Sequence, residues 1–152
     1  YLWAKFYWVG FDFPSVGRNE GDTAGFNDKG LITYDRKTRK DAYFWYQANW
    51  SNKPMVYITS RRDTERTDAD MDVKVYSNAS STTLTVNGKT LAPVPVVDHV
   101  ATWSIRLQPG HNRLRVTANG ASDDAVFYLK SADMPGGRTA ASQGSSNERA
   151  DR

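Results

Sequence analysis

An aromatic opening segment, LWAKFYWVGFDF at residues 2–13, is the feature that most constrains this chain. So many large apolar side chains normally enter a hydrophobic core, because burial removes them from water. Residues 21–50, GDTAGFNDKGLITYDRKTRKDAYFWYQANW, supply little of such a core. The chain also opens without a starting Met. We therefore expect it to be the C-terminal piece of a larger protein, whose other residues share its chemistry.

Composition limits the classes of site that the chain can hold. Its 152 residues suffice for one ordinary domain and some additional structure. Cys is absent, which excludes a disulfide framework and thiolate metal sites and leaves the compartment open. The two His residues, His99 and His111, lie far apart in the sequence and argue against a His-based metal site. We expect no metal and no cofactor.

Neither a membrane nor a nucleic acid is an expected partner. No segment reaches the roughly 18 consecutive apolar residues that span a bilayer. The formal net charge is +3. The basic groups at residues 36–40 and 61–62 alternate with Asp35, Asp41 and Asp63. We interpret them as a solvated surface of mixed charge, with a phosphate-binding face as the alternative.

Residues 1–50 are predicted to hold one strand, a long loop and one helix. The strand covers about residues 5–13, the glycine-rich loop runs over residues 14–29, and residues 30–34 are extended. Thr38, followed by Asp41, predicts the N-cap of the helix. One helical face collects Ala42, Trp45, Tyr46 and Asn49, with Tyr43 and Trp50 beside it. A single strand and helix cannot bury these faces alone.

Residues 51–131 are predicted to form a β-sandwich of immunoglobulin type. Apolar residues alternate with polar ones at Met71, Val73 and Val75, at Leu84 and Val86, at Trp103, Ile105 and Leu107, at Leu114, Val116 and Ala118, and at Ala125, Phe127 and Leu129. A further strand is predicted at residues 55–59. Asn87-Gly88 predicts a type I′ hairpin, and Pro109-Gly110 predicts a turn into a return strand. Residues 132–152 have almost no apolar content after Met134, so we expect a disordered tail or linker.

The first fifty residues resemble the end of the catalytic barrel in glycoside hydrolase family 2, the β-galactosidase and β-glucuronidase family. Its last barrel strand carries a W-x-x-x-D-F pattern, which Trp8, Asp12 and Phe13 match. Its following loop carries N-x-K-G and then D-R-K, matched by Asn27, Lys29 and Gly30 and by residues 35–37. The resemblance extends over about residues 1–131. It implies the last β/α unit of a TIM (β/α)8 barrel at residues 1–50, then an immunoglobulin-like sandwich at residues 51–131.

The resemblance implies a retaining exo-β-glycosidase in which this chain lines one wall of the sugar pocket. Active sites of such barrels lie at the C-terminal ends of the strands, where the loop after Phe13 falls. Trp8 offers a flat apolar platform for a sugar ring. Asn27 and Lys29 contact the sugar carboxylate in the family's β-glucuronidases, and a uronate needs such compensation for its lost hydration. β-Galactosidase specificity remains the alternative.

The resemblance also implies that the catalytic residues lie outside this chain. Retaining hydrolysis needs two carboxyl groups about 5–5.5 Å apart, and the family supplies both as Glu from earlier barrel strands. None of Glu20, Glu65 and Glu148 matches either position. We therefore predict no catalytic residue here, an inactive isolated chain, and the rest of the polypeptide and a carbohydrate as partners. The family points to a periplasmic or secreted bacterial setting. A non-catalytic carbohydrate-binding sandwich is the competing function.

Overall fold

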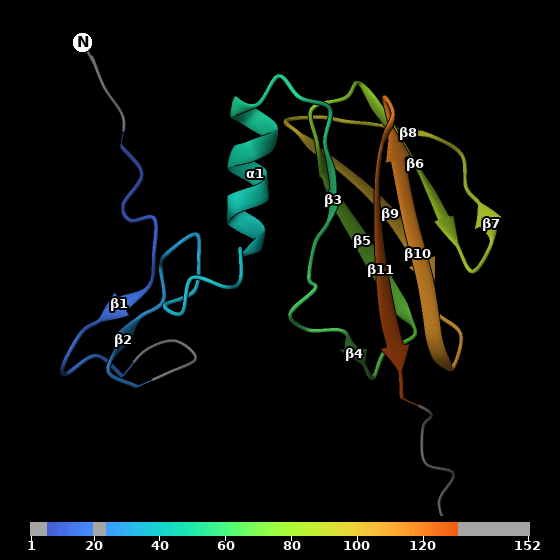
Figure 1. The fold of residues 1–152 in the computed structure, drawn as a ribbon. Helices are drawn as coiled ribbons and strands as arrows, with labels where there is room; N and C mark the ends of the chain where they lie inside the picture. Colours follow the sequence, from blue (N-terminus) through green and yellow to red (C-terminus); the bar gives the residue numbers. More distant parts are fainter. Residues whose placement is uncertain (1–5, 20–23, 131–152) are drawn as a thin grey trace, which may run out of the picture.

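The computed structural model describes residues 6–19 and 24–130, and its largest part is a sandwich of two β-sheets (Figure 1). One sheet has the order β3-β5-β9, with β3 at Val56–Ile58, β5 at Asp70–Ser77 and β9 at Val100–Arg106. The other has the order β4-β11-β10-β6-β7, and β8 also pairs with β6. Its strands are β4 (Glu65–Arg66), β6 (Ser81–Val86), β7 (Lys89–Thr90), β8 (Val94–Pro95), β10 (Gly110–Ala118) and β11 (Ala121–Leu129). The prediction of a mainly β chain is confirmed.

The order of the longer strands is that of an immunoglobulin-type sandwich. In chain order, β3, β5 and β9 occupy the places of strands A, B and E, while β6, β10 and β11 occupy those of C, F and G. The short strand β4 pairs in parallel with β11 and extends the second sheet. The tail predicted for residues 132–152 lies outside the described residues.

The core between the two sheets contains the alternating apolar residues. The completely buried side chains include Val73 and Val75 on β5, Leu84 on β6, Leu114 and Val116 on β10, and Phe127 on β11. Successive side chains of a strand point to opposite faces, so each of these strands has one face in the core and the other towards solvent. The alternation in the sequence therefore identified the core strands.

Two hairpins of the second sheet close through Asn-Gly turns. Asn87 and Gly88 both have positive φ, 50° and 83°, and they join β6 to β7, which confirms the predicted type I′ turn. Asn119 and Gly120 repeat this geometry, with φ of 47° and 79°, between β10 and β11. The second turn carries the same Asn-Gly signal as the first, but it was not predicted from the sequence.

The chain turns at Pro109-Gly110 into the predicted strand, but that strand lies in the other sheet. Strand β9 ends before it and β10 begins at Gly110, but β9 pairs with β5 whereas β10 pairs with β6 and β11. The chain therefore crosses from one sheet to the other here. A turn signal shows where the chain reverses and says nothing about which sheet receives the next strand.

Helix α1, Asp41–Trp50, lies beside the β3-β5-β9 sheet (Figure 1). Its N-cap is Lys40, which makes no side-chain capping hydrogen bond, so the predicted cap at Thr38 is wrong. Thr38 instead closes a turn: its N–H donates to Thr33 Oγ1 at 3.1 Å, and its carbonyl accepts from Thr33 N–H at 2.9 Å. These bonds place Thr38 before the helix starts.

The helix packs on the sandwich through a face other than the predicted one. Phe44 and the buried Ala48, four residues apart, contact Met55 and Tyr57. The rings of Phe44 and Tyr57 stack with centroids 3.6 Å apart. From the predicted face, Ala42 and Asn49 are exposed and Trp45 and Tyr46 are half-buried. Apolar residues surround this helix on all sides, so periodicity alone did not select the face that meets the sheet.

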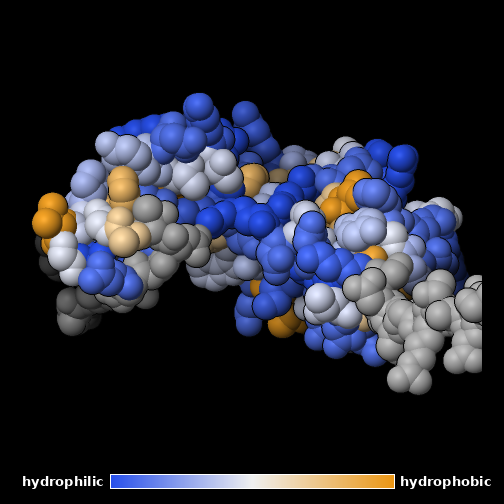
Figure 2. Space-filling view, turned by 90° about the horizontal axis from the view of Figure 1, so that it is seen from below, coloured by the Kyte–Doolittle hydropathy of each residue, from blue (hydrophilic) through white to orange (hydrophobic). Residues whose placement is uncertain are grey.

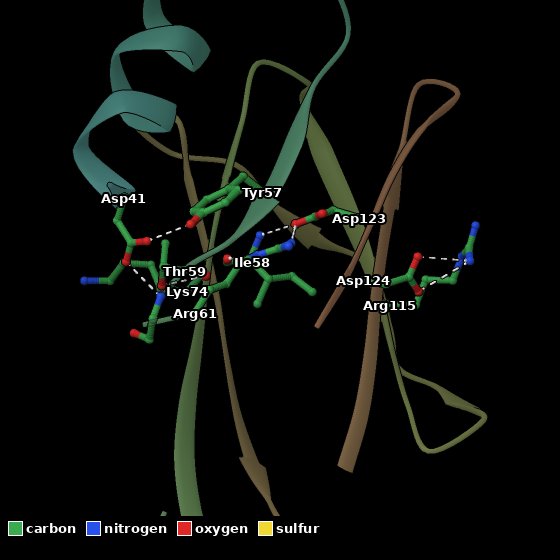
Figure 3. Close-up of polar contacts among 10 residues, drawn as sticks. Asp41, Tyr57, Ile58, Thr59, Arg61, Lys74, Arg115, Asp123 and Asp124 are labelled. Atoms are coloured by element: carbon green, nitrogen blue, oxygen red, sulfur yellow. Dashed lines mark hydrogen bonds and ion pairs between the residues drawn. The ribbon is translucent and has the colours of Figure 1, made fainter. Parts of the chain in front are cut away.

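Asp41 fastens the start of the helix to the sandwich (Figure 3). One of its carboxylate oxygens accepts from the Tyr57 hydroxyl at 2.8 Å, and the other accepts from the Ser60 N–H at 2.8 Å. Burial, and then the bond to the Asp41 carboxylate, raise the pKa of the Tyr57 hydroxyl well above its ordinary value. Both effects disfavour the charged phenolate in the folded protein.

We expect Tyr57 to make folding stability sensitive to alkaline pH. The unfolded chain ionises Tyr57 near its ordinary pKa of 10.0, whereas the folded chain keeps it neutral. Its contribution is therefore complete below that pH and is lost as the pH rises further. Urea unfolding between about pH 9 and about pH 11 should show a steeper loss in the wild type than in Tyr57→Phe. Parallel losses in the two proteins would contradict this assignment.

The N-terminal part forms little regular structure among its described residues. The strand expected at residues 5–13 is replaced by β1, Phe13–Pro14, which pairs with β2, Phe26–Asn27, and by an isolated bridge between Phe11 and Ile32. Val9 has a φ of 131°, which interrupts an extended conformation. A strand needs hydrogen-bonding neighbours along its length, and the described residues offer them only near its end.

No hydrophobic interior forms within residues 6–19 and 24–50. Ala48 is the only buried apolar residue of these described residues, and it belongs to the contact with the sandwich. The side chains of Phe6, Trp8, Val16 and Trp50 are largely exposed. Residues 1–50 therefore do not close a core of their own in the described part.

Candidate functional site

Asp12 organises the region that holds the predicted sugar-binding residues. Its side chain is nearly buried, and its Oδ1 accepts from the Gly30 N–H at 2.9 Å and from Lys40 Nζ at 2.7 Å. Lys40 also donates to the carbonyl of Asp28. One ion pair thus joins the segment before β1, the loop after β2 and the residue that caps α1. The sequence motif contained Asp12, but no local pattern indicated that it pairs with Lys40.

Gly30 fits at this junction because it has no side chain. A Cβ at this position would lie 2.2 Å from the backbone nitrogen of Asp12 and 2.3 Å from the carbonyl carbon of Phe11. These are backbone atoms, which cannot rotate away as the end of a side chain can. The glycine that follows Asn27-Asp28-Lys29 therefore allows the loop to lie directly against the segment before β1.

The structure brings Asn27 and Lys29 together on one loop. Asn27 is buried, and its Oδ1 accepts from the Lys29 N–H at 3.1 Å. The Lys29 carbonyl accepts from the Tyr7 hydroxyl at 3.0 Å, while the Lys29 side chain is exposed. The amide oxygen of Asn27 therefore shapes the loop, and the ammonium group of Lys29 projects from it.

Trp8 is next in the chain to Tyr7, which contacts this loop, and the Trp8 side chain itself is largely exposed. Its neighbour Tyr7 contacts both Lys29 and, ring edge to ring face, Tyr46 of α1 with centroids 4.9 Å apart. Burial raises the pKa of the Tyr7 hydroxyl. Trp8 itself is 72% exposed. An indole so exposed is available to another surface or to a ligand.

A pocket of about 320 Å³ opens beside the loop. It is lined by Asp12, Phe26, Asp28, Thr33, Tyr34, Asp35, Thr38, Lys40 and Arg62. Its charged groups include Asp12, which Lys40 pairs, and Asp35, whose pKa is lowered by hydrogen bonds from the Thr33 hydroxyl and the Lys37 N–H. Asp28 lines the pocket, whereas its two neighbours in the predicted motif face elsewhere on the loop.

Of the three Glu residues in the chain, the structure describes only Glu65. Glu20 and Glu148 lie outside the described residues. Glu65 is on the exposed strand β4, where its carboxylate pairs with Lys130 Nζ at 2.6 Å and raises the pKa of that lysine. This surface ion pair is on the sandwich and far from the Asn27–Lys29 loop in Figure 1.

Neither a metal cluster nor a membrane-spanning helix is found in the part of the chain that the structure describes. Across residues 6–19 and 24–130, His, Cys, Asp and Glu nowhere gather in a group of three that could hold a metal ion. None of the described helical residues forms a helix long and apolar enough to cross a bilayer. His111 packs against the Tyr128 ring on the sandwich.

The fold and the site define a helix-linked β-sandwich that carries an aromatic segment without a core of its own. Residues 68–126 match a family model described as a domain of unknown function, DUF4982. The chain is 37% identical over 140 residues to a β-glucuronidase of Bacteroides fragilis, covering 89% of this chain and 20% of that protein. It is 39% identical over 88 residues to a putative β-glucuronidase of Formosa agariphila, covering 55% of this chain and 10% of that protein.

Solved structures of similar proteins resemble this chain in both sequence and fold. The chain matches an FMN-binding β-glucuronidase from Faecalibacterium prausnitzii at 40% identity and a TM-score of 0.78, over 84% of this chain and 20% of that one. It matches a putative β-galactosidase from Bacteroides fragilis at 35% identity and a TM-score of 0.74, over 81% of this chain and 19% of that one. The resemblance to the β-galactosidase and β-glucuronidase family is confirmed. The chain spans about a fifth of the length of the Bacteroides fragilis β-glucuronidase and of the two solved structures, and a tenth of the Formosa agariphila protein.

Proposed function

We propose that this chain forms part of a retaining exo-β-glycosidase that removes terminal β-linked sugars, with β-glucuronides as the favoured substrates. In this proposal residues 1–50 are the last β/α unit of the catalytic barrel, and residues 51–131 are the sandwich that follows it. The relatives named β-glucuronidase and β-galactosidase support the reaction class. The exposed Phe6 and Trp50 and the aromatic outer face of α1 support a barrel that covers them.

The observation that carries the proposal is the anchored loop at Asn27-Asp28-Lys29. Tyr7, Asp12 and Lys40 hold this loop by hydrogen bonds to its backbone or to the adjoining glycine. The loop therefore has a defined shape without a ligand, and it presents the Lys29 ammonium group. A cation carried by an anchored loop offsets the desolvation of a sugar carboxylate, whereas a neutral galactose leaves the cation unpaired.

Each predicted site residue then has a distinct task. Trp8 supplies an apolar platform for the C–H face of the sugar ring. Asn27 orients the loop and Lys29 binds the carboxylate. The nucleophile and the acid/base are two Glu residues from the remainder of the polypeptide, about 5–5.5 Å apart as retaining hydrolysis requires. The chain by itself is expected to be inactive.

A non-catalytic carbohydrate-binding sandwich is the second candidate, and the placement of the aromatic residues favours the first. A binding sandwich presents rings on a sheet face or at loop tips. Here Trp103 and Phe127 of the sandwich are buried, as their alternation predicted, whereas Phe6, Trp8 and Trp50 are exposed in the N-terminal part. Apart from Tyr128 on β11, the exposed Phe, Tyr and Trp rings of the described residues lie in the part that the glycosidase proposal assigns to the barrel.

Replacing Lys29 tests the substrate preference. In the full-length protein, Lys29→Ala is expected to lower kcat/KM for a chromogenic β-glucuronide by roughly 100-fold or more, because the carboxylate loses its charged partner. The same substitution should leave turnover of the matching β-galactoside nearly unchanged. Lys53→Ala removes an exposed charge from the connection after α1 and is the matched control. Glucuronide turnover that survives Lys29→Ala would remove the carboxylate role.

A further inference from the structure

A groove of about 530 Å³ lies between the segment that precedes α1 and the start of the sandwich. Five cationic side chains line it: Arg36, Lys37, Arg39, Arg61 and Arg62. Ile32, Thr38, Phe44 and Tyr57 complete the described lining, in which no carboxylate occurs. Strongly hydrophilic residues cross the middle of the face shown in Figure 2, between the N-terminal part and the sandwich. So many positive charges around one groove create a local potential that attracts anions.

Aromatic rings position three of these cations. The Arg36 guanidinium lies 3.7 Å from the centroid of the Phe11 ring. Arg39 lies over Tyr43 and Arg61 over Tyr57, each with its guanidinium carbon 4.8 Å from the ring centroid. A guanidinium that stacks on a ring can keep its N–H edges available as donors, as at Arg36 and Arg39. The Arg61 guanidinium is already engaged, because it donates to the Ile58 carbonyl and pairs with Asp123. The groove is therefore partly organised before any ligand binds.

The acidic residues near these cations in the sequence are engaged elsewhere in the fold. Asp41 accepts from the Tyr57 hydroxyl and the Ser60 N–H, and Asp63 pairs with Arg66. Asp35 accepts from the Thr33 hydroxyl and the Lys37 N–H. The sequence alternates basic and acidic residues, but no carboxylate lines the groove. Asp123 pairs with Arg61 from outside the lining, so Arg36, Lys37 and Arg39 are the cations that face an anion. This sorting of charge favours the anion-binding interpretation, which the sequence analysis ranked second.

The groove adjoins the pocket beside the Asn27–Lys29 loop. Thr38 and Arg62 line both the groove and that pocket, and Asp28 of the loop lines the pocket as well. The groove and the pocket therefore share part of their lining, and the pocket borders the proposed sugar-binding loop through Asp28. A chain molecule bound at the loop can extend its next units past the pocket towards the groove.

We propose that this groove binds the sulfate or carboxylate groups of an anionic oligosaccharide whose terminal sugar is held at the Asn27–Lys29 loop. The inference rests on the proposed function and adds a second binding region for an extended substrate. Arg and Lys side chains bind such groups through charge-assisted hydrogen bonds. A single-stranded nucleic acid fits less well, because its bases need free ring faces. The rings of Phe44 and Tyr57 stack on each other at 3.6 Å, which occupies those faces.

Calorimetric titration of the full-length protein tests the groove. The probe is a hexasaccharide of alternating glucuronate and sulfated N-acetylgalactosamine at low ionic strength. The double variant Lys37→Gln/Arg39→Gln removes two exposed groove charges and is expected to weaken binding roughly 5- to 30-fold. Lys89→Gln/Arg113→Gln removes the same net charge from exposed positions on β7 and β10 and should change the Kd less than about twofold.

A single variant, an oligonucleotide and a small substrate distinguish groove binding from misfolding, from general charge effects and from failure of the proposed function. Lys37→Gln alone, at an exposed side chain, should show a smaller loss in the same direction if the double variant folds poorly. Equal losses in the groove and control variants would overturn the inference, as would an absence of binding by the wild type. Equally tight binding of a single-stranded oligonucleotide, with the same loss in the variants, would also overturn it. Turnover of a small chromogenic glucuronide tests the proposed function separately, because it needs no groove contact.

Discussion

Replacement of Phe127 by Ala is expected to lower the free energy of unfolding of the sandwich by about 3–5 kcal/mol. Phe127 is completely buried on β11, among the core residues of both sheets. Removing its ring loses the free energy of transfer from water and also leaves a cavity that a close-packed core fills only in part. A loss of this size is a large share of the stability of an ordinary domain. Urea denaturation followed by circular dichroism measures it.

The neighbouring residue provides the control for this prediction. Val126 lies on the same strand but is 47% exposed, because successive side chains point to opposite faces. We expect Val126→Ala to change the free energy of unfolding by less than about 1 kcal/mol. If the two substitutions cost the same, the face assigned to the core on β11 would be wrong.

Gly30→Ala is expected to disrupt the anchored loop. The free energy of the native loop conformation should rise by about 3 kcal/mol or more, because the added Cβ overlaps backbone atoms and not movable side chains. The hydrogen bond from Gly30 to Asp12 would be lost, and with it the placement of Lys29. Amide hydrogen exchange should show loss of protection at residues 30–32. In the full-length protein we also expect glucuronide turnover to fall sharply, because the loop no longer presents its ammonium group.

A second glycine of the same region separates crowding from simple loss of flexibility. Gly10 has no atom within 4 Å of an added Cβ and no positive φ. Gly10→Ala should therefore leave exchange and turnover close to the wild-type values. Should Gly30→Ala behave like Gly10→Ala, the close approach of the loop to Asp12 would not be needed for function.

The sandwich could be predicted because its signals are local. Alternation at residues 71–75 and 114–118 determines which side chains enter a core, since the pleat of a strand has a period of two. Asn87-Gly88 marks a hairpin because both residues tolerate positive φ. The same reasoning would have found Asn119-Gly120. The catalytic-barrel and site assignments depended instead on the family resemblance, and the roles of Trp8 and Lys29 stay predictions.

The N-terminal part shows where local reasoning ends. The opening segment is apolar enough for a strand, but in the described residues its regular pairing is limited to β1 and β2. A strand is stabilised by its neighbours, so its sequence predicts the tendency and not the length. The helix carries aromatic residues around its circumference, and only the adjacent sheet decided that Phe44 and Ala48 face it.

The sequence by itself determined the mainly β class, the core positions of the strands and the resemblance to the β-galactosidase and β-glucuronidase family, because periodicity, turn residues and motifs are properties of neighbouring residues. The tertiary structure alone decided that Asp12 pairs with Lys40 across 28 positions and that β9 and β10 lie in opposite sheets. It also decided that no carboxylate lines the cationic groove. These features join residues that are distant in the chain. Their energies depend on burial and on the separation of charges in space, which the order of residues does not specify.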